Sequence, residues 1–295
     1  MFVGCRRGAG PEPASSWSWR RADRQRVHGQ PHPSKRRLSA LGLRPKKRLS
    51  QSFLEDEHVA TAIVRAADLD GSKDVLEVGP GLGVLTTRLA KIARRVVAVE
   101  LDPRLAESLE GDNVSVVNED ILRFDPAKVF GESYTVVANL PYHITSPALR
   151  HLLGAGPPYA ERLVVMVQAD VAERIAAKPG DMSAIAVVIQ VQARVSILRR
   201  VKADAFYPRP KVDSAVVVLE PVSERTVERN EIEAFTTLVQ AGFKQRRKTI
   251  ANSFADGLAV SKADATSRLE RAEIDPTRRP QALRLEDWVR LFRTN

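Results

Sequence analysis

Residues 75–83 read Val-Leu-Glu-Val-Gly-Pro-Gly-Leu-Gly, an apolar run that leads directly into a turn with three glycines. A short apolar run of this kind predicts a buried strand, and closely spaced glycines let the backbone turn sharply and approach a ligand. The spacing Gly-x-Gly-x-Gly, with Pro80 inside it, differs from the Gly-x-Gly-x-x-Gly of dinucleotide-binding loops. The stretch therefore indicates an α/β fold whose first strand opens on a ligand pocket of another kind.

Further strands and helices are predicted on both sides of this turn. Before it, residues 57–67 carry apolar side chains at helical spacing, and a helix is expected after it, to about Ile92. Strand-like runs follow at 95–100, 114–117, 134–138, 163–167 and 212–219. Helical patterns separate the earlier strands, and this alternation predicts a mainly parallel, doubly wound sheet.

After Pro221 the pattern changes to helices alone, near 230–242, 246–256, 261–271 and 284–293. We therefore expect a disordered basic tail over 1–45, a Rossmann-like domain over 46–222 and a small all-helical domain over 223–295. Residues 1–48 hold thirteen Lys or Arg and two acidic residues, a net charge of +11. That leaves 33 basic against 34 acidic residues, or −1, for 49–295, so the folded body is nearly neutral.

The basic tail allows several interpretations. We favour disorder with no specific role, because its scattered Arg, Gly and Pro residues lack apolar periodicity. A basic arm on RNA phosphates, an organellar transit peptide and translation from a start codon placed too early are the alternatives. The only cysteine is Cys5, which excludes an intramolecular disulfide and a cysteine-rich zinc site, and no metal is expected. With neither a membrane-length apolar run nor a secretory signal, we expect a soluble, cytoplasmic protein, unless the tail directs import.

Polar residues end three of the predicted strands. Glu100 ends the second strand, 21 residues after Gly79, where a carboxylate can accept both hydroxyls of a ribose. Asp120 follows the third strand, where it can accept a hydrogen bond from the amine of a bound adenine, and Asn139 ends the fourth. Because ligands of open α/β sheets bind outside the carboxyl ends of the strands, we expect one crevice to collect these residues. An exposed strand-end carboxylate remains the alternative for Glu100.

The run Asn139-Leu140-Pro141-Tyr142 puts an amide acceptor, a rigid turn and an aromatic face within four residues. This set can hold a flat heterocycle that carries an amino group, by its edge and by its face. Phe206 is a candidate second face, because Pro208 and Pro210 restrict its loop. A simple strand end is the alternative for Asn139, and an ordinary core aromatic is the alternative for Phe206.

Taken together, these motifs resemble those of the ribosomal RNA adenine N6-dimethyltransferases, which use S-adenosylmethionine. The resemblance runs from about Lys46 to the C-terminus. It is carried by Glu77-Val-Gly-Pro-Gly-Leu-Gly83, Glu100-Leu-Asp102, Glu119-Asp120, Asn139-Leu-Pro-Tyr142, Gln51-Ser-Phe-Leu54, Gln168-Ala-Asp-Val-Ala-Glu-Arg174, Ala205-Phe-Tyr-Pro-Arg-Pro-Lys-Val-Asp-Ser214 and Phe243-Lys-Gln-Arg-Arg-Lys-Thr249.

The resemblance implies a Rossmann-like methyltransferase sheet and assigns two sets of residues. The cofactor contacts that it implies are Ser52, Leu54, Gly79, Gly81, Glu100, Asp120, Ile121 and Asn139. The catalytic residues that it implies are Asn139, Leu140, Pro141, Tyr142 and Phe206. Ser52 stands where the family usually has Asn, and the loop 178–185 is shorter than usual and lacks the family's Tyr-Gly pair.

Two branches of this family compete. One dimethylates two adjacent adenosines near the 3′ end of small-subunit (16S) rRNA and contributes to small-subunit biogenesis, and Asn-Leu-Pro-Tyr resembles this branch. The other dimethylates one adenosine of large-subunit (23S) rRNA, confers macrolide resistance and usually reads Asn-Ile-Pro. A non-catalytic RNA-binding assembly or transcription factor is a further alternative.

Cationic clusters predict contacts with RNA phosphates. They comprise Lys244, Arg246, Arg247 and Lys248, and Arg199, Arg200 and Lys202 with Arg209 and Lys211. Solvated helix faces are the alternative. We expect a monomer that binds small-subunit rRNA in a pre-ribosomal particle, with no membrane contact.

Overall fold

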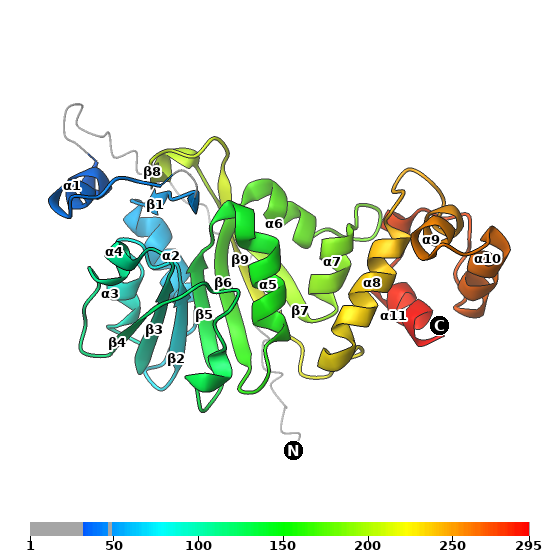
Figure 1. Cartoon of the computed structure of the whole chain (residues 1–295), viewed down its shortest axis with the longest axis horizontal. Coiled ribbons are helices and arrows are strands. Elements are labelled where there is room, and N and C mark those ends of the chain that lie inside the picture. Colours follow the sequence, from blue (N-terminus) through cyan, green and yellow to red (C-terminus); the bar gives the residue numbers. More distant parts are fainter. Residues whose placement is uncertain (1–31, 47–48, 295) are drawn as a thin grey trace, which may run out of the picture. The chain divides into compact units, whose positions relative to one another are not determined.

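The structure is a computed structural model that describes residues 32–46 and 49–294. Its centre is a seven-stranded sheet with the order β4-β3-β2-β5-β6-β9-β7 (Figure 1). The first five strands in this order are parallel to one another, and β9 pairs antiparallel with both β6 and β7. The predicted doubly wound sheet is confirmed. The strands are β2 (Asp74–Val78), β3 (Arg95–Glu100), β4 (Val114–Asn118), β5 (Tyr134–Asn139), β6 (Ala160–Gln168), β7 (Ala193–Val201) and β9 (Ser214–Pro221).

Helices cover both faces of the sheet, which explains why its central strands are apolar on both sides. One face packs against α2 (Glu57–Ala66) and α3 (Thr86–Leu89). The other packs against α5 (Thr145–Gly154), α6 (Ala169–Ile175) and α7 (Ala184–Gln190). The short helix α4 (Pro103–Ala106) follows β3. Among the described residues, no helix combines the length and apolar character needed to cross a bilayer.

The last four helices form a second apolar core. They are α8 (Ile232–Gly242), α9 (Ile250–Leu258), α10 (Lys262–Arg271) and α11 (Leu285–Arg293). Phe235, Phe254 and Trp288 are fully buried in this core, and Val187 of α7 belongs to it. These four helices therefore contact the sheet domain through α7. The domain boundary at 222/223 stays a prediction.

The expectation of disorder over 1–45 is wrong for residues 32–45, while residues 1–31 lie outside the described residues. A helix, α1, spans Pro33–Ala40 and begins with a proline in its first turn, where a missing N–H costs nothing. Leu38 and Leu43 are buried against Phe53. Two leucines are too few for a visible apolar period, but here both pack on an apolar surface that includes Phe53, Leu82 and Leu105.

Three other local predictions differ from the structure. The strand β7 was not predicted, because it is an edge strand with a bulge near Leu198 and its alternation is interrupted. The strand predicted from Val212 begins at Ser214, and Val212 is exposed in the preceding loop. The helix expected to reach Ile92 is regular only over α3, and turns continue beyond it.

The helix predicted over 246–256 begins at Ile250, because Thr249 caps it. The Thr249 side chain accepts a hydrogen bond from the Asn252 backbone N–H, which satisfies one of the free donors of the first turn. Residues 244–248 therefore form turns between α8 and α9, and their cations are displayed on a connection rather than along a helix face.

Candidate active site

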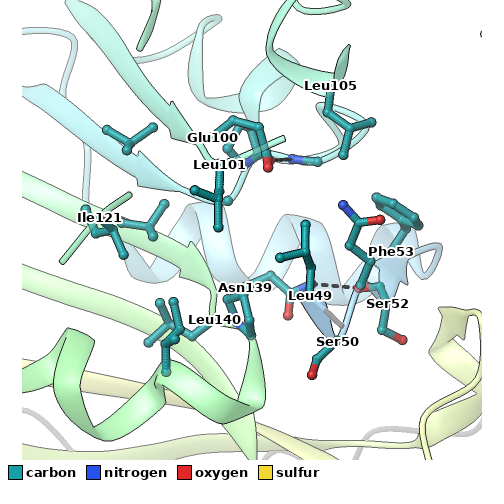
Figure 2. A pocket seen from close by; sticks show the side chains of 18 of the residues that line it. Leu49, Ser50, Ser52, Phe53, Glu100, Leu101, Leu105, Ile121, Asn139 and Leu140 are labelled. Carbon is teal, nitrogen blue, oxygen red and sulfur yellow. Dashed lines mark hydrogen bonds between the residues drawn. The ribbon is translucent and has the colours of Figure 1, made fainter. Parts of the chain in front are cut away.

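One pocket lies at the carboxyl ends of β2, β3 and β5 (Figure 2). Every residue that the sequence singled out as catalytic or cofactor-binding lines it: Ser52, Leu54, Gly79, Gly81, Glu100, Asp120, Ile121, Asn139, Leu140, Pro141, Tyr142 and Phe206. The order of the strands explains this convergence, since β3, β2 and β5 are neighbours in the sheet. The structure therefore places the predicted residues around one cavity, and their individual roles stay predictions.

The glycine turn after β2 depends on backbone conformations that other residues rarely adopt. Gly79 has φ +67° and Gly81 has φ +58°. A Cβ added at Gly81 would lie 3.1 Å from the Phe53 ring of β1 (Phe53–Leu54), so a side chain there would also crowd this ring. The Gly79 N–H donates to the Val99 carbonyl oxygen at 2.9 Å, which ties the turn to the end of β3. The turn is thus rigid and open toward the pocket.

Glu100 is held by backbone donors at both of its carboxylate oxygens. The Gly81 N–H donates to Oε2 at 3.1 Å and the Asp102 N–H donates to Oε1 at 2.9 Å. The side chain is 7% exposed, and burial raises the pKa of its carboxyl, while these two hydrogen bonds act in the opposite direction. Each oxygen keeps a further lone pair, so a ribose diol in the pocket can donate to the same carboxylate.

A second carboxyl, that of Glu77, lies beneath the glycine turn and was not predicted as a site residue. It is 1% exposed, and burial raises its pKa to about 8, so the side chain is mainly protonated at neutral pH. Thr86 lies beside it and lowers this pKa somewhat, although no hydrogen bond joins Thr86 Oγ1 to a described residue. An acidic residue inside an otherwise apolar predicted strand was the available signal.

Asn139 is oriented by a single hydrogen bond. Its Nδ2 donates to the Ser52 backbone carbonyl oxygen at 3.1 Å (Figure 2). Because a carbonyl oxygen accepts only, the amide nitrogen must face Ser52, and Oδ1 is left as an acceptor on the pocket side. The next residue, Leu140, is 1% exposed and donates its backbone N–H to Met166 at 3.1 Å. Neither Asn139 Oδ1 nor the Leu140 carbonyl accepts a hydrogen bond from any residue that the structure describes.

The two predicted aromatic faces differ in exposure. Tyr142 is half-buried, and its hydroxyl lies 2.9 Å from Ser214 Oγ, which fixes the ring at the pocket rim. Burial raises the pKa of this phenol, with the Ser214 contact opposing it. Phe206 of β8 (Phe206–Tyr207) is 2% exposed, because it pairs with Leu54 and packs into the core beside α2. Tyr142 is therefore the more available ring, and stacking by Phe206 stays a prediction.

The remaining predicted contacts are held by short local bonds. The Ser52 hydroxyl donates to the Pro208 carbonyl oxygen at 2.5 Å, so its direct contact with a cofactor stays a prediction. One carboxylate oxygen of Asp120 accepts the Leu122 N–H at 3.0 Å, which directs the side chain over the end of β4. The sequence missed other lining residues, which include Leu49, Phe53, Leu101, Leu105 and His143. Phe53 and Leu101 lie inside quoted motifs, but four of these five side chains are apolar and the sequence assigns none of the five a specific contact with a ligand.

Some residues of the two cationic clusters form ion pairs, and the others do not. Arg200 pairs with Glu173, Lys202 pairs with Asp213 at 2.9 Å, and Lys244 pairs with Asp256 at 3.4 Å. The others form no ion pair with any residue in the described part of the chain: Arg199, Arg209, Lys211, Arg246, Arg247 and Lys248. Unpaired, exposed cations are the better candidates for contacts with phosphates.

Comparison with known proteins identifies the family. The sequence profile of the ribosomal RNA adenine dimethylases matches residues 42–294. The chain belongs to the ribosomal RNA adenine dimethylase family. It is an rRNA adenine methyltransferase, as the motifs around the pocket predicted.

Several members of this family resemble the chain over nearly their full length. A protein from Dehalococcoides mccartyi named "Ribosomal RNA small subunit methyltransferase A" is 41% identical, over 88% of this chain and 91% of its own. One of the same name from Moorella thermoacetica is 40% identical, over 86% and 93%. The crystal structure of the 23S rRNA methyltransferase ErmE is 31% identical, with a TM-score of 0.64, and covers 82% of this chain and 98% of its own.

Proposed function

We propose that the chain transfers methyl groups from S-adenosylmethionine to N6 of two adjacent adenosines near the 3′ end of small-subunit rRNA. The observation that carries this proposal is the orientation of Asn139, whose amide is turned by Ser52 so that Oδ1 can accept a hydrogen bond in the pocket. Curated relatives at about 40% identity, which are named for the small subunit, support the choice of substrate. Action in the cytoplasm, as a monomer, is part of the proposal.

The cofactor half of the pocket fits an adenosyl group. The Glu100 carboxylate can accept both ribose hydroxyls, because two backbone N–H groups already hold it in place. Asp120 can accept a hydrogen bond from the adenine amine through the oxygen that Leu122 does not occupy. When bound, S-adenosylmethionine supplies a methyl group on a sulfonium, which is a strong leaving group.

The base half of the pocket acts on a weak nucleophile, since the lone pair of the adenine amino group is delocalised into the ring. Hydrogen bonds from its two protons to Asn139 Oδ1 and the Leu140 carbonyl oxygen favour a more pyramidal, electron-rich nitrogen. The same two acceptors aim that nitrogen at the methyl group, so positioning supplies much of the rate. The nitrogen loses its proton to solvent water after the methyl is attached, when that proton is acidic, so a dedicated general base is not needed.

The target base must leave its stack to reach this pocket, at a cost of a few kcal/mol. Stacking on the half-buried ring of Tyr142 offsets roughly 1–3 kcal/mol of the cost of unstacking the base. The hydrogen bond between its hydroxyl and Ser214 holds the ring ready, so little freedom is lost when the base arrives.

The similarity to a 23S rRNA methyltransferase of known structure supports a second candidate, large-subunit methylation. It is the weaker candidate, because that protein is 31% identical to the chain, against about 40% for the relatives named for the small subunit. Leu140, where the large-subunit branch usually has Ile, also favours the small subunit.

The deciding experiment incubates the protein with S-adenosylmethionine carrying a labelled methyl group and with unmethylated small or large ribosomal subunits. Mapping of the modified base is expected to find dimethylated adenosines in small-subunit rRNA. Label on large subunits alone would favour the second candidate. Cofactor binding without transfer to either subunit would favour a non-catalytic RNA-binding factor.

A further inference from the structure

A second hollow opens beside the active-site pocket, between α1 and the loop after β8; we call it the α1 groove. Its walls are Lys35, Leu38 and Ser39 of α1 with residues 43–45 on one side, and residues 207–212 on the other. The α1 groove and the pocket share Ser50, Gln51, Ser52 and Tyr142. The groove therefore continues from the rim where a target base would enter.

The α1 groove is lined by exposed cations, and one of them, Arg209, also interacts electrostatically with Asp213, the partner of Lys202. Lys35, Arg44, Arg209 and Lys211 line the groove, and no acidic residue does among those that the structure describes. All four are exposed, and none forms an ion pair with any residue within 32–46 and 49–294. Nearby cations such as Lys46, which lies 2.8 Å from Asp102, are paired. Four exposed cations around one hollow make a local site for a polyanion.

The α1 wall is fixed to the pocket rather than loosely attached. Leu38 is 3% exposed and Leu43 is 8% exposed, and both belong to an apolar cluster with Phe53, Leu82 and Leu105, which line the pocket. At the start of α1, the Ser34 N–H donates to Glu55 at 3.0 Å, and the His32 ring stacks on Tyr207 with 4.9 Å between centroids. The ring stacking thus ties His32, the residue that precedes α1, to Tyr207 of the opposite wall.

The spacing within α1 selects which of its cations face the groove. Lys35, Leu38 and Ser39 are three and four residues apart, so they share one face of the helix. Arg36 and Arg37 are also exposed but do not line the groove. Arg36 and Arg37 therefore provide a matched control on the same helix.

We propose that the α1 groove holds the single-stranded RNA next to the target adenosine, with its phosphates beside Lys35, Arg44, Arg209 and Lys211. The inference rests on the proposed function and adds a wall that the catalytic motifs do not contain. A flipped base draws its neighbouring nucleotides past Tyr142, and their backbone then meets the groove directly. A cleft that combines cations with Tyr142 and Tyr207 matches the way single strands are bound, by charge along the backbone and aromatic rings under the bases.

The test compares two charge-reversed forms of the full chain. The groove variant is Lys35→Glu with Arg44→Glu, and the control is Arg36→Glu with Arg37→Glu, which changes the net charge by the same amount. Binding to unmethylated small subunits is measured at several salt concentrations, and cofactor affinity is measured by calorimetry. We expect the groove variant to bind subunits at least about tenfold more weakly and to lower the salt slope by about 1.4, since each single-strand phosphate contact contributes about 0.7. The control should change affinity less than about threefold, and cofactor affinity should be unchanged in both.

The outcomes separate this inference from the proposed function. If the wild-type protein methylates small subunits but both variants lose equal affinity, or neither does, the α1 groove is not the RNA path. Weaker cofactor binding in the groove variant alone would also overturn the inference. If the wild-type protein does not methylate small subunits, the proposed function fails whatever the variants do.

A second readout does not depend on activity. A photo-crosslinking residue at Ser39, in the groove, is compared with one at Arg36, outside it. Crosslinks from position 39 to rRNA within a few nucleotides of the modified adenosines support the inference. Crosslinks from position 39 to a ribosomal protein, or to rRNA equally from both positions, contradict it.

Discussion

The cofactor side of the pocket and the RNA-facing side are built in different ways. On the cofactor side, glycines with positive φ and a carboxylate 7% exposed are locked by backbone hydrogen bonds at the ends of β2 and β3. On the RNA-facing side, exposed cations stand on α1 and the segment after it, which Leu38 and Leu43 anchor, and on the loop 207–212. The cofactor side holds specific atoms in fixed positions, and the RNA-facing side supplies positive charge. Substitutions on the first should be severe and local, whereas those on the second should be graded and sensitive to salt.

The largest effect is expected at Asn139, where the two sides meet. Asn139→Ala removes the acceptor that aims the adenine nitrogen, and a misplacement of about 1 Å can cost roughly 10²-fold in rate. We expect kcat for small subunits to fall by at least about 10²-fold, with cofactor binding weakened but measurable. Single-turnover methylation and calorimetry measure the two quantities separately.

A second substitution at the same position tests the orientation of the amide. Asn139→Asp keeps an acceptor in the pocket but cannot donate to the Ser52 carbonyl, so it should also be severely impaired. Near-wild-type turnover in either variant would contradict the proposed clamp.

Glu100 should have the next largest effect, and on the cofactor alone. Glu100→Ala removes both acceptors for the ribose and leaves the Gly81 and Asp102 N–H groups unpaired, at about 1–3 kcal/mol for each. We expect the Kd for S-adenosylmethionine to rise by about 100-fold in calorimetry, while RNA affinity at fixed salt is little changed. The Glu100→Gln variant should also bind S-adenosylmethionine weakly, because one amide oxygen cannot accept hydrogen bonds from two backbone donors on opposite sides.

A matched control for this variant is Glu107→Ala, since Glu107 is exposed and does not line the pocket. An unchanged cofactor Kd in Glu100→Ala would mean that the ribose lies elsewhere. If Glu100→Ala weakened RNA binding as much as it weakened cofactor binding, the cofactor side and the RNA-facing side would not act independently.

Glu77 offers a pH test of the cofactor side. Its pKa is about 8 in the folded protein, against 4.5 as the ordinary value, so the folded state binds a proton that the unfolded state releases. This contribution to stability is fully present below about pH 4.5 and is lost as pH rises through about 8, with a slope of up to about 1.4 kcal/mol per pH unit. Urea unfolding at pH 5, 6, 7 and 8 measures it.

Glu77→Gln keeps the shape and removes the titration, so the difference between the two unfolding free energies should change steadily over this range. Glu107→Gln should run parallel to the wild type. A wild-type profile that matches Glu77→Gln at every pH would show that this carboxyl is ionised in the folded protein.

The cofactor side could be predicted from sequence because its backbone demands particular residues. Gly79 and Gly81 have φ values that side chains disfavour, and Glu100 stands at a fixed distance from them on the next strand. Asn139 could be placed because a parallel sheet brings strand ends to one edge. What remained hidden was Glu77 as a buried acid, since its burial depends on α3 packing above it.

The RNA-facing side could not be predicted as well. Residues 33–40 have one buried leucine and five basic or polar residues, a pattern typical of a solvated segment, and they are held by contacts with distant residues that include Phe53, Leu82 and Glu55. Lys35 and Arg209 are 174 positions apart, and no local pattern reports that they face one groove. Ion pairing could not be predicted from the sequence either. Arg199 and Arg200 are adjacent, yet only Arg200 forms an ion pair, with Glu173.

The smallest effect is expected from removing residues 1–31, and it tests where the RNA-facing side begins. Deletion of 1–31 keeps α1, so cofactor affinity and kcat/KM on small subunits should stay within about twofold of the full chain, as expected if no contact of α1 depends on that segment. Deletion of 1–45 also removes Leu38 and Leu43, whose burial is worth about 1.5–3 kcal/mol each, and the cations Lys35 and Arg44. It should bind subunits about tenfold more weakly, in line with the loss of two phosphate contacts. Equal activity of both deletions would show that α1 is only a cover, and a large loss on deleting 1–31 would assign RNA binding to the basic tail.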